Sequence, residues 1–320
     1  MTAAPQIPLP HSPLSHPASG GPALPGMRRA RVRKHSPVVL PYCKAEAMDT
    51  EGARAEELRG GINRVVRLRG TVVRPMGRHS AAVHEVLRHL ERVGFVGAPR
   101  LLTVDQENRT ETVSFLEGEV ADYPLPQTFT TDKAMRSAAQ LLRKLHDALA
   151  TFTIPAGVDW WLPAVEPGEI VVHGDFAPYN CILQDGTITG VFDFDTAHPA
   201  HRLWDVGYAA YRWVPLVAPS NPDGYGSIES QIRRLPEFCE AYGISELGPV
   251  IDNARLRLLV MVKSMRQHAA DGHTAFQQHL RDGHDALYLR DIDYLEANRA
   301  VLIGERPRGA PVAPSLNTSR

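Results

Sequence analysis

The chain of 320 residues has few cysteines, no excess charge of either sign and no long apolar run. A net charge of −1 provides no basic surface for a phosphate backbone, so nucleic-acid binding is not indicated. The cysteines, Cys43, Cys181 and Cys239, are odd in number and widely spaced, which argues against a disulfide framework and a zinc site. Because no apolar run approaches about 18 residues, no membrane span is predicted. The composition is typical of a cytoplasmic enzyme.

The most informative segment is residues 171–195, where His173 and Asp175 are followed by Asn180 and then by Asp193. The spacing is Asp175-x4-Asn180-x12-Asp193. An aspartate that can act as a base, followed by an amide oxygen and a carboxylate, is an arrangement that kinase-type phosphoryl transfer uses with Mg²⁺. The alternative interpretation is that these residues only occupy turns and caps, which Asp and Asn favour in any case.

A hairpin is predicted between the amide and the last carboxylate of this segment. Two apolar runs, 181–183 and 188–192, are separated by Asp185 and Gly186. This dipeptide is typical of a two-residue hairpin turn. The hairpin returns the chain on itself, so we expect the two oxygen ligands at its ends to converge on one ion.

Residues 171–212 resemble the catalytic core of the aminoglycoside phosphotransferase and choline kinase superfamily, a branch of the protein-kinase-like fold. The resemblance implies that Asp175 is the catalytic base and that His173 is a mostly structural residue holding the loop. It also implies that Asn180 and Asp193 bind Mg²⁺ in an ATP-dependent reaction.

Three further residues of this core leave two interpretations each. Asp205 is similar to the family's aspartate that opens a helix and braces the catalytic loop from below, and it is equally compatible with a plain helix N-cap. Asp195 either assists the metal or caps the next turn. His146, in a helix predicted over residues 132–150, is interpreted as a satisfied interior histidine rather than a catalyst.

The resemblance implies an α+β, two-lobed protein-kinase-like fold, with a small antiparallel β-rich lobe and a larger, mainly helical lobe. Residues 1–50 are rich in Pro, Ser, Ala and Gly and are predicted to be a disordered tail. Residues 51–117 would form the nucleotide-binding N-lobe and residues 118–306 the catalytic and substrate-binding C-lobe. Residues 307–320 are predicted to be a flexible tail.

Lysine is scarce, and the segment 45–132 contains none. Kinases place a lysine on the third strand of the N-lobe to hold the nucleotide phosphates. Arg74 occupies that position here, and a guanidinium can grip phosphate with two hydrogen bonds, although its geometry differs from that of an ammonium. On the helix predicted over residues 80–93, Glu85 is the expected ion-pair partner of Arg74. A solvated helix charge is one alternative for Glu85, and a register shifted by one residue, which would place His84 there, is another.

Two other N-lobe segments are candidates for nucleotide binding. Gly60 and Gly61 precede a hairpin predicted over residues 64–74, where a phosphate loop should be, although an ordinary turn explains them equally well. Residues 111–118 resemble the family's hinge between the lobes. Backbone groups near Ser114, Phe115 and Leu116 are therefore expected to hydrogen-bond the adenine.

The C-terminal part is predicted to form helices over residues 228–242, 250–270 and 275–301. Aspartates there would either line an anionic pocket for an amine or lie on the helix surface, and we favour the surface; they are Asp271, Asp282, Asp285, Asp291 and Asp293. Tryptophans would either cage a quaternary ammonium or pack in the core, and core packing is the simpler account; they are Trp160, Trp161, Trp204 and Trp213.

The sequence as a whole predicts an ATP- and Mg²⁺-dependent phosphotransferase that moves the γ-phosphate to a hydroxyl of a small molecule, which is aminoglycoside-, choline- or sugar-like. The alternative is a catalytically silent nucleotide-binding or interaction module on a kinase fold, which the missing lysine favours. Metal-dependent hydrolysis fits less well, because hydrolases usually gather several His and Asp ligands. The sequence indicates neither the acceptor nor the oligomeric state.

Overall fold

The computed structural model describes residues 44–48, 54–59 and 64–305, with side chains from Val65 onward. All of them belong to one compact unit, His35–Arg320. Gly60 and Gly61, most of the segment 1–50 and the tail 307–320 lie outside the described residues.

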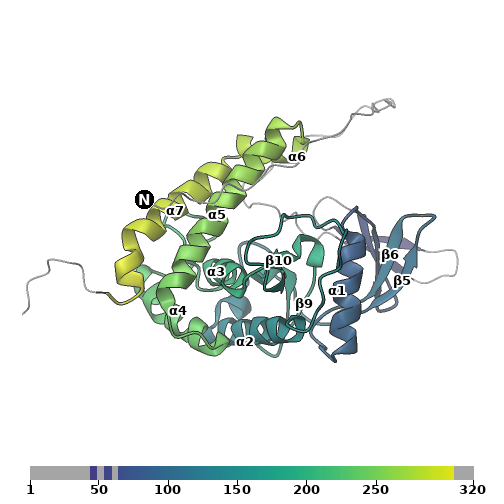
Figure 1. Cartoon of the computed structure of the whole chain (residues 1–320), viewed down its shortest axis with the longest axis horizontal. Helices are drawn as coiled ribbons and strands as arrows, with labels where there is room; N and C mark the ends of the chain where they lie inside the picture. Colours follow the sequence, from purple (N-terminus) through teal and green to yellow (C-terminus); the bar gives the residue numbers. More distant parts are fainter. Residues whose placement is uncertain (1–43, 49–53, 60–63, 306–320) are drawn as a thin grey trace, which may run out of the picture. The chain divides into compact units, whose positions relative to one another are not determined.

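The smaller lobe contains an antiparallel six-stranded sheet with the order β1-β2-β3-β4-β6-β5 (Figure 1). Its strands are β1 (Lys44–Met48), β2 (Arg54–Arg59), β3 (Arg64–Leu68), β4 (Thr71–Pro75), β5 (Leu101–Asp105) and β6 (Thr110–Ser114). The predicted hairpin is confirmed: Arg69 and Gly70 both have positive φ, 44° and 79°, as a two-residue turn between twisted strands requires. Strand β1 falls in the segment 1–50 that the sequence assigns to a disordered tail.

Helix α1 (Ser80–Arg92) lies between this sheet and the larger lobe (Figure 1). It contacts β5 on the sheet side, and α2 and the short helix η3 on the other side. One apolar face of the helix is buried, with Val83, Val86, Leu87 and Leu90 at most 2% exposed. The helix therefore joins the cores of the two lobes.

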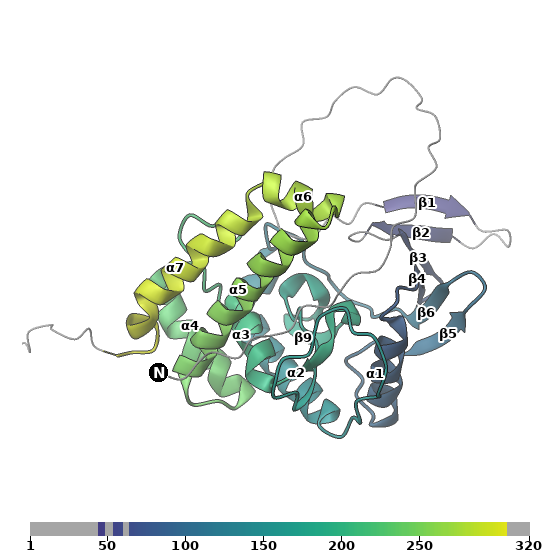
Figure 2. The same ribbon diagram turned by 45° about the horizontal axis from the view of Figure 1, so that its top comes forward.

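The larger lobe is mainly helical. Its helices are α2 (Asp132–Leu149), α3 (Arg202–Trp213), α4 (Ile228–Tyr242), α5 (Leu247–Ala270), α6 (Thr274–Arg281) and α7 (His284–Leu302), with three short 3₁₀ helices, η1 (Gln127–Thr130), η2 (Pro178–Asn180) and η3 (Phe194–Thr196). Two small antiparallel sheets pair β7 (Ile170–Val172) with β10 (His198–Ala200), and β8 (Cys181–Gln184) with β9 (Thr187–Val191). Helix α3 packs on α5, which runs beside α7 (Figure 2).

The single helix expected over residues 275–301 is wrong. The chain breaks at Gly283, which has a φ of 79°, and α6 and α7 are separate helices. Two of the residues judged from sequence also differ in their surroundings. Trp161 is exposed rather than packed in the core. Asp291 is fully buried, where its carboxylate accepts hydrogen bonds from Tyr211 and Asn221, whereas the sequence favoured a surface position.

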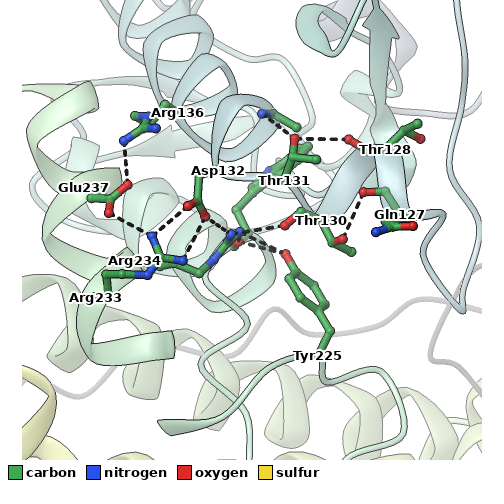
Figure 3. Close-up of polar contacts among 12 residues, drawn as sticks. Gln127, Thr128, Thr130, Thr131, Asp132, Arg136, Tyr225, Arg233, Arg234 and Glu237 are labelled. Atoms are coloured by element: carbon green, nitrogen blue, oxygen red, sulfur yellow. Dashed lines mark hydrogen bonds and ion pairs between the residues drawn. The ribbon is translucent and has the colours of Figure 1, made fainter. Parts of the chain in front are cut away.

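A network of charges fixes the start of α2 against α4 (Figure 3). Asp132 accepts a hydrogen bond of 2.7 Å from Arg233 and another from Arg234. Arg234 is buried and also donates to the carbonyl oxygen of Thr130, at 3.1 Å. Thr131 caps α2 by accepting from the amide of Ala134 at 3.1 Å. The network therefore caps the helix and gives partners to both terminal nitrogens of a buried guanidinium.

We predict that Asp132→Asn lowers the free energy of unfolding by about 2–3 kcal/mol, because Arg234 loses the carboxylate that compensates its burial. Hydrogen bonds from Arg233 and the positive charge of Arg234 lower the pKa of Asp132, against the small effect of burial. The stabilisation is therefore complete above the ordinary Asp pKa of about 3.9 and is lost as the pH falls through the lowered pKa. Chemical denaturation at pH 7 and at pH 3 measures both effects.

The matched control is Glu85→Gln, which breaks a half-exposed pair with Arg88 and should cost less than about 0.5 kcal/mol. Equal losses in the two variants at pH 7 would contradict the role assigned to Asp132.

Candidate functional site

The hairpin expected between Asn180 and Asp193 is confirmed. Asp185 and Gly186 form its turn with φ values of 50° and 71°, and β8 pairs with β9 around it. At the open end, the amide of Phe192 donates to the carbonyl oxygen of Asn180 at 2.9 Å. The two expected metal ligands are thereby brought to the same end of the hairpin.

Asp175 is held in one orientation by neighbouring side chains. Its Oδ1 accepts a hydrogen bond from the Tyr179 hydroxyl at 2.8 Å, and its Oδ2 accepts one from Asn180 Nδ2 at 2.9 Å. The Tyr179 hydroxyl also lies 3.0 Å from that of Tyr208 on α3. Sequence reasoning missed Tyr179, because a tyrosine beside a short helix is equally typical of a core residue.

Asp205 braces the loop that carries Asp175. It is almost fully buried, and its carboxylate accepts from the amides of His173 at 2.9 Å and Gly174 at 3.0 Å. His146 Nε2 lies 3.2 Å from the same carboxylate. Although burial opposes ionisation, the hydrogen bond from His146 lowers the pKa of Asp205. The N-cap alternative is wrong, since His201 occupies that position and Asp205 lies in the first turn of α3.

His173 belongs to the loop itself, and its ring does not face solvent. Its ring is fully buried, Nε2 is 3.0 Å from the carbonyl oxygen of Phe192, and Nδ1 accepts from the amide of Asp175 at 3.2 Å. Burial lowers the pKa of His173 and favours the neutral ring. A neutral ring that donates through Nε2 and accepts through Nδ1 connects the catalytic loop to the end of β9.

Gly174 allows the loop to bend tightly at this point. Its φ is 82°, and a Cβ added there would lie 2.4 Å from the carbonyl oxygen of Thr196. The Gly174 carbonyl oxygen accepts from Arg257 of α5 at 2.9 Å. Only glycine meets both the conformational and the steric requirement.

Asp193 and Asp195 place two carboxylates close together. Asp193 adopts the left-handed conformation, with φ 63° and ψ 66°, and half of its side chain is exposed. Burial around the carboxylate and the negative charges of Asp195 and Asp175 raise its pKa, against the attraction of Arg74. Because half of the side chain is exposed, we assign most of this shift to the two like charges. A bound cation would relieve that repulsion.

The donor set at this position fits Mg²⁺. Asn180 uses its amide nitrogen for two hydrogen bonds to Asp175, so its amide oxygen is left for another partner. With the carboxylate of Asp193, this gives two hard oxygen ligands, and Mg²⁺ commonly completes its shell with water and phosphate oxygens. Among residues 44–48, 54–59 and 64–305, no group of three or more His, Cys, Asp or Glu side chains could hold a metal.

Arg74 connects the sheet to these carboxylates. Its cross-strand partner on β6 is Glu111, and Arg74 Nε donates to Glu111 Oε1 at 2.5 Å. Its Nη2 lies 2.9 Å from Asp195 Oδ1 and its Nη1 lies 3.8 Å from Asp193 Oδ1. Burial opposes the charged form, but the carboxylates of Asp195, Glu111 and Asp193 raise the pKa of Arg74 further above its ordinary value.

The expected pair between Arg74 and Glu85 is wrong. Glu85 instead accepts from Arg88 at 2.5 Å on the outer face of α1. The inward position of the helix belongs to His84, whose Nε2 lies 2.5 Å from Glu111 Oε2. The sequence contains a signal that the Glu111 side chain points inward. Successive residues of a strand face opposite sides, so Glu111 lies on the same face of β6 as the buried Val113.

The hinge residues differ in what their amides already bind. The amide of Ser114 donates to Arg100 O at 2.9 Å and that of Phe115 to Gly70 O at 2.8 Å. The amide of Leu116 forms no hydrogen bond with any residue in the described part of the chain. Of the three expected adenine contacts, Leu116 alone therefore retains a backbone donor.

Sequence comparison relates the chain to known proteins. A model of the phosphotransferase enzyme family matches residues 156–240, which include the loop, the hairpin and α3. The trifolitoxin immunity protein of Rhizobium leguminosarum bv. trifolii is 32% identical over 193 residues, covering 58% of this chain and 72% of the relative. The chain belongs to the phosphotransferase enzyme family.

Comparison with solved structures supports the same fold for this family member. The GDP complex of aminoglycoside 2'-phosphotransferase-IIIa has a TM-score of 0.51 and 15% identity, covering 77% of this chain and 93% of its own. A choline/ethanolamine kinase family protein from Mesorhizobium loti has a TM-score of 0.47 and 17% identity, covering 76% and 92% of the two chains. The α+β, two-lobed protein-kinase-like fold expected from the sequence is confirmed. No helix among the described residues is long and apolar enough to cross a membrane.

We predict that Gly174→Ala lowers the free energy of unfolding by about 2–4 kcal/mol, since it adds both left-handed strain and a backbone clash. Gly70→Ala is the matched control: its φ is 79°, but a Cβ there meets no atom within 4 Å. It should cost only about 1 kcal/mol. Urea denaturation of both variants measures the difference in the free energy of unfolding. Equal losses would show that the clash with the Thr196 carbonyl oxygen does not add to the destabilisation.

Proposed function

We propose that this protein is an ATP-dependent phosphotransferase that transfers the γ-phosphate to a hydroxyl group of a small molecule. One observation carries the proposal: the oriented carboxylate of Asp175 lies at the same end of the hairpin as the oxygen ligands of Asn180 and Asp193. Kinase-type transfer needs a base and a cation site in this relation.

In this proposal Asp175 accepts the proton of the acceptor hydroxyl. The hydroxyl oxygen forms a bond to the γ-phosphorus while the bond between the γ-phosphorus and the ADP oxygen breaks. The hydrogen bonds from Tyr179 and Asn180 keep the carboxylate aimed at the acceptor. Mg²⁺ held by Asn180 and Asp193 would neutralise charge on the phosphates. Positioning and charge stabilisation, rather than covalent chemistry, would account for the rate.

Nucleotide binding is assigned to the N-lobe, residues 51–117, and acceptor binding to the C-lobe, residues 118–306. The free amide of Leu116 would hydrogen-bond the adenine. Arg74, held from behind by Glu111, would hold the phosphates in place of a lysine. From the sequence we also propose that Gly60 and Gly61 cover the nucleotide phosphates.

The relatives favour a protective role as a second, more specific candidate. The 32% identical relative is named an immunity protein, and an aminoglycoside phosphotransferase shares the fold. Phosphorylation of a hydroxyl on a toxin or antibiotic would add charge and block its binding to a target. Growth of a sensitive host that expresses the chain, compared with one expressing an Asp175→Asn variant, tests this role.

The competing interpretation is a silent nucleotide-binding module. The absence of the lysine favours it, whereas the retained Asp175, Asn180 and Asp193 favour catalysis. Binding of Mg²⁺–ATP without any ADP formation, with hydroxylated amines and sugars present as acceptors, would support the silent module.

We predict that calorimetric titration detects ATP binding with Mg²⁺ and much weaker binding with a chelator. Arg74→Met should weaken ATP binding about 10–100-fold, because two charged hydrogen bonds to phosphate are lost. Arg88→Met is the control, since Arg88 pairs with Glu85 on the surface of α1. Unchanged ATP affinity in Arg74→Met would remove Arg74 from the nucleotide site.

We also predict that Asp175→Asn lowers turnover about 10²–10⁴-fold, the usual contribution of a general base. Its thermal unfolding should remain close to that of the wild type, since asparagine can still accept from Tyr179. Asp185→Asn, in the turn of the hairpin, should retain activity. ADP formation at saturating ATP measures all three proteins, and full turnover in Asp175→Asn would rule out Asp175 as the base.

A further inference from the structure

The position of Arg74 has a feature that phosphate binding does not account for. Its guanidinium reaches three carboxylates at once: Nε contacts Glu111 at 2.5 Å, Nη2 contacts Asp195 at 2.9 Å, and Nη1 lies 3.8 Å from Asp193. The side chain is 17% exposed and Glu111 is fully buried. The nitrogens that would bind phosphate therefore already face the acidic pair that includes a metal ligand.

From this geometry we infer that Arg74 is the resident counter-ion of the Asp193–Asp195 pair, so that divalent cation and nucleotide bind this chain cooperatively. The inference rests on the proposed function, because it takes Asp193 as a cation ligand and Arg74 as a phosphate ligand. Without nucleotide, Arg74 competes with the cation for the carboxylates. When phosphate takes Nη1 and Nη2, the carboxylates become available to the metal.

Two details of the chain support this exchange. Glu111 binds only the Nε edge and is fixed from its other side by His84 at 2.5 Å, so the base of the guanidinium stays in place while the outer nitrogens change partner. Asp195 keeps a second partner, since His79 Nε2 lies 3.6 Å from its Oδ2. A lysine has a single ammonium group and lacks the fork that reaches Glu111 and Asp195 together.

Binding of the cation and binding of the nucleotide are thermodynamically linked. If nucleotide raises the affinity for the cation by some factor, the cation raises the affinity for nucleotide by the same factor. Removing the arginine takes a positive charge from within about 4 Å of the ligand carboxylates, where a divalent ion would feel it strongly. The cation should then bind without nucleotide, and the coupling between the two ligands should become small.

The experiment measures Mn²⁺ binding to the full chain by electron paramagnetic resonance of the free ion, first without nucleotide and then with a non-hydrolysable ATP analogue. Arg74→Met should bind Mn²⁺ at least about tenfold more tightly than wild type without nucleotide. Arg74→Lys should lie between the two, and Arg88→Met should behave as wild type. The ratio of Mn²⁺ affinities with and without the analogue should fall toward one in Arg74→Met.

Because Arg74→Met leaves Glu111 without its main partner, the double variant Arg74→Met with Glu111→Gln provides a second test that removes the buried charge. Unchanged or weaker nucleotide-free Mn²⁺ binding in both folded variants would overturn the counter-ion role. Failure of the proposed function has a different signature, namely a wild-type chain that binds no Mg²⁺–ATP, whatever the Mn²⁺ results for the variants.

Discussion

The buried carboxylate of Asp205 is the interaction on which the site depends. One side chain accepts hydrogen bonds from two consecutive backbone amides, those of His173 and Gly174, directly before Asp175. A buried charge is retained only when it is well hydrogen-bonded, and here the charge is satisfied by the loop itself. Rigid helix α3 thus sets the loop conformation, and the loop sets the direction of the Asp175 carboxylate. His146 connects the same carboxylate to α2, so the brace joins three parts of the C-lobe.

A second group of charges links the two lobes. Arg74 belongs to the sheet, whereas Asp193 and Asp195 follow β9 in the helical lobe. The anion that steadies Arg74 comes from the neighbouring strand and not from α1, because His84 occupies the inward position of that helix. Arg74 and Glu111, on neighbouring strands, therefore belong to one arrangement. The forked side chain of Arg74 reaches Asp193 and Asp195 while the sheet holds its Nε edge.

Local chemistry explains what could be predicted from the sequence. The hairpin turns at Arg69–Gly70 and Asp185–Gly186 depend on residues close in the chain, and both were confirmed. The cap at Thr131 and the buried face of α1 have equally local causes. The helix break at Gly283 is a local error, whereas the other errors involve contacts between distant residues. Glu111 meets Arg74 across a sheet from 37 positions away, and no spacing rule within α1 could reveal that. Tyr179 and Asp291 were missed because their partners on α3 become neighbours only in the folded chain.

The left-handed backbone conformation of Asp193 disfavours folding at a position where the proposed chemistry needs a carboxylate. A residue with a Cβ pays conformational strain at a φ of 63°, which glycine would avoid. Its carboxylate also lies beside a second acid, so the position is unfavourable both sterically and electrostatically. Selection for thermal stability alone would replace this aspartate early. This acidic position at the end of the hairpin is thus one that an inactive descendant of this chain would be expected to lose early.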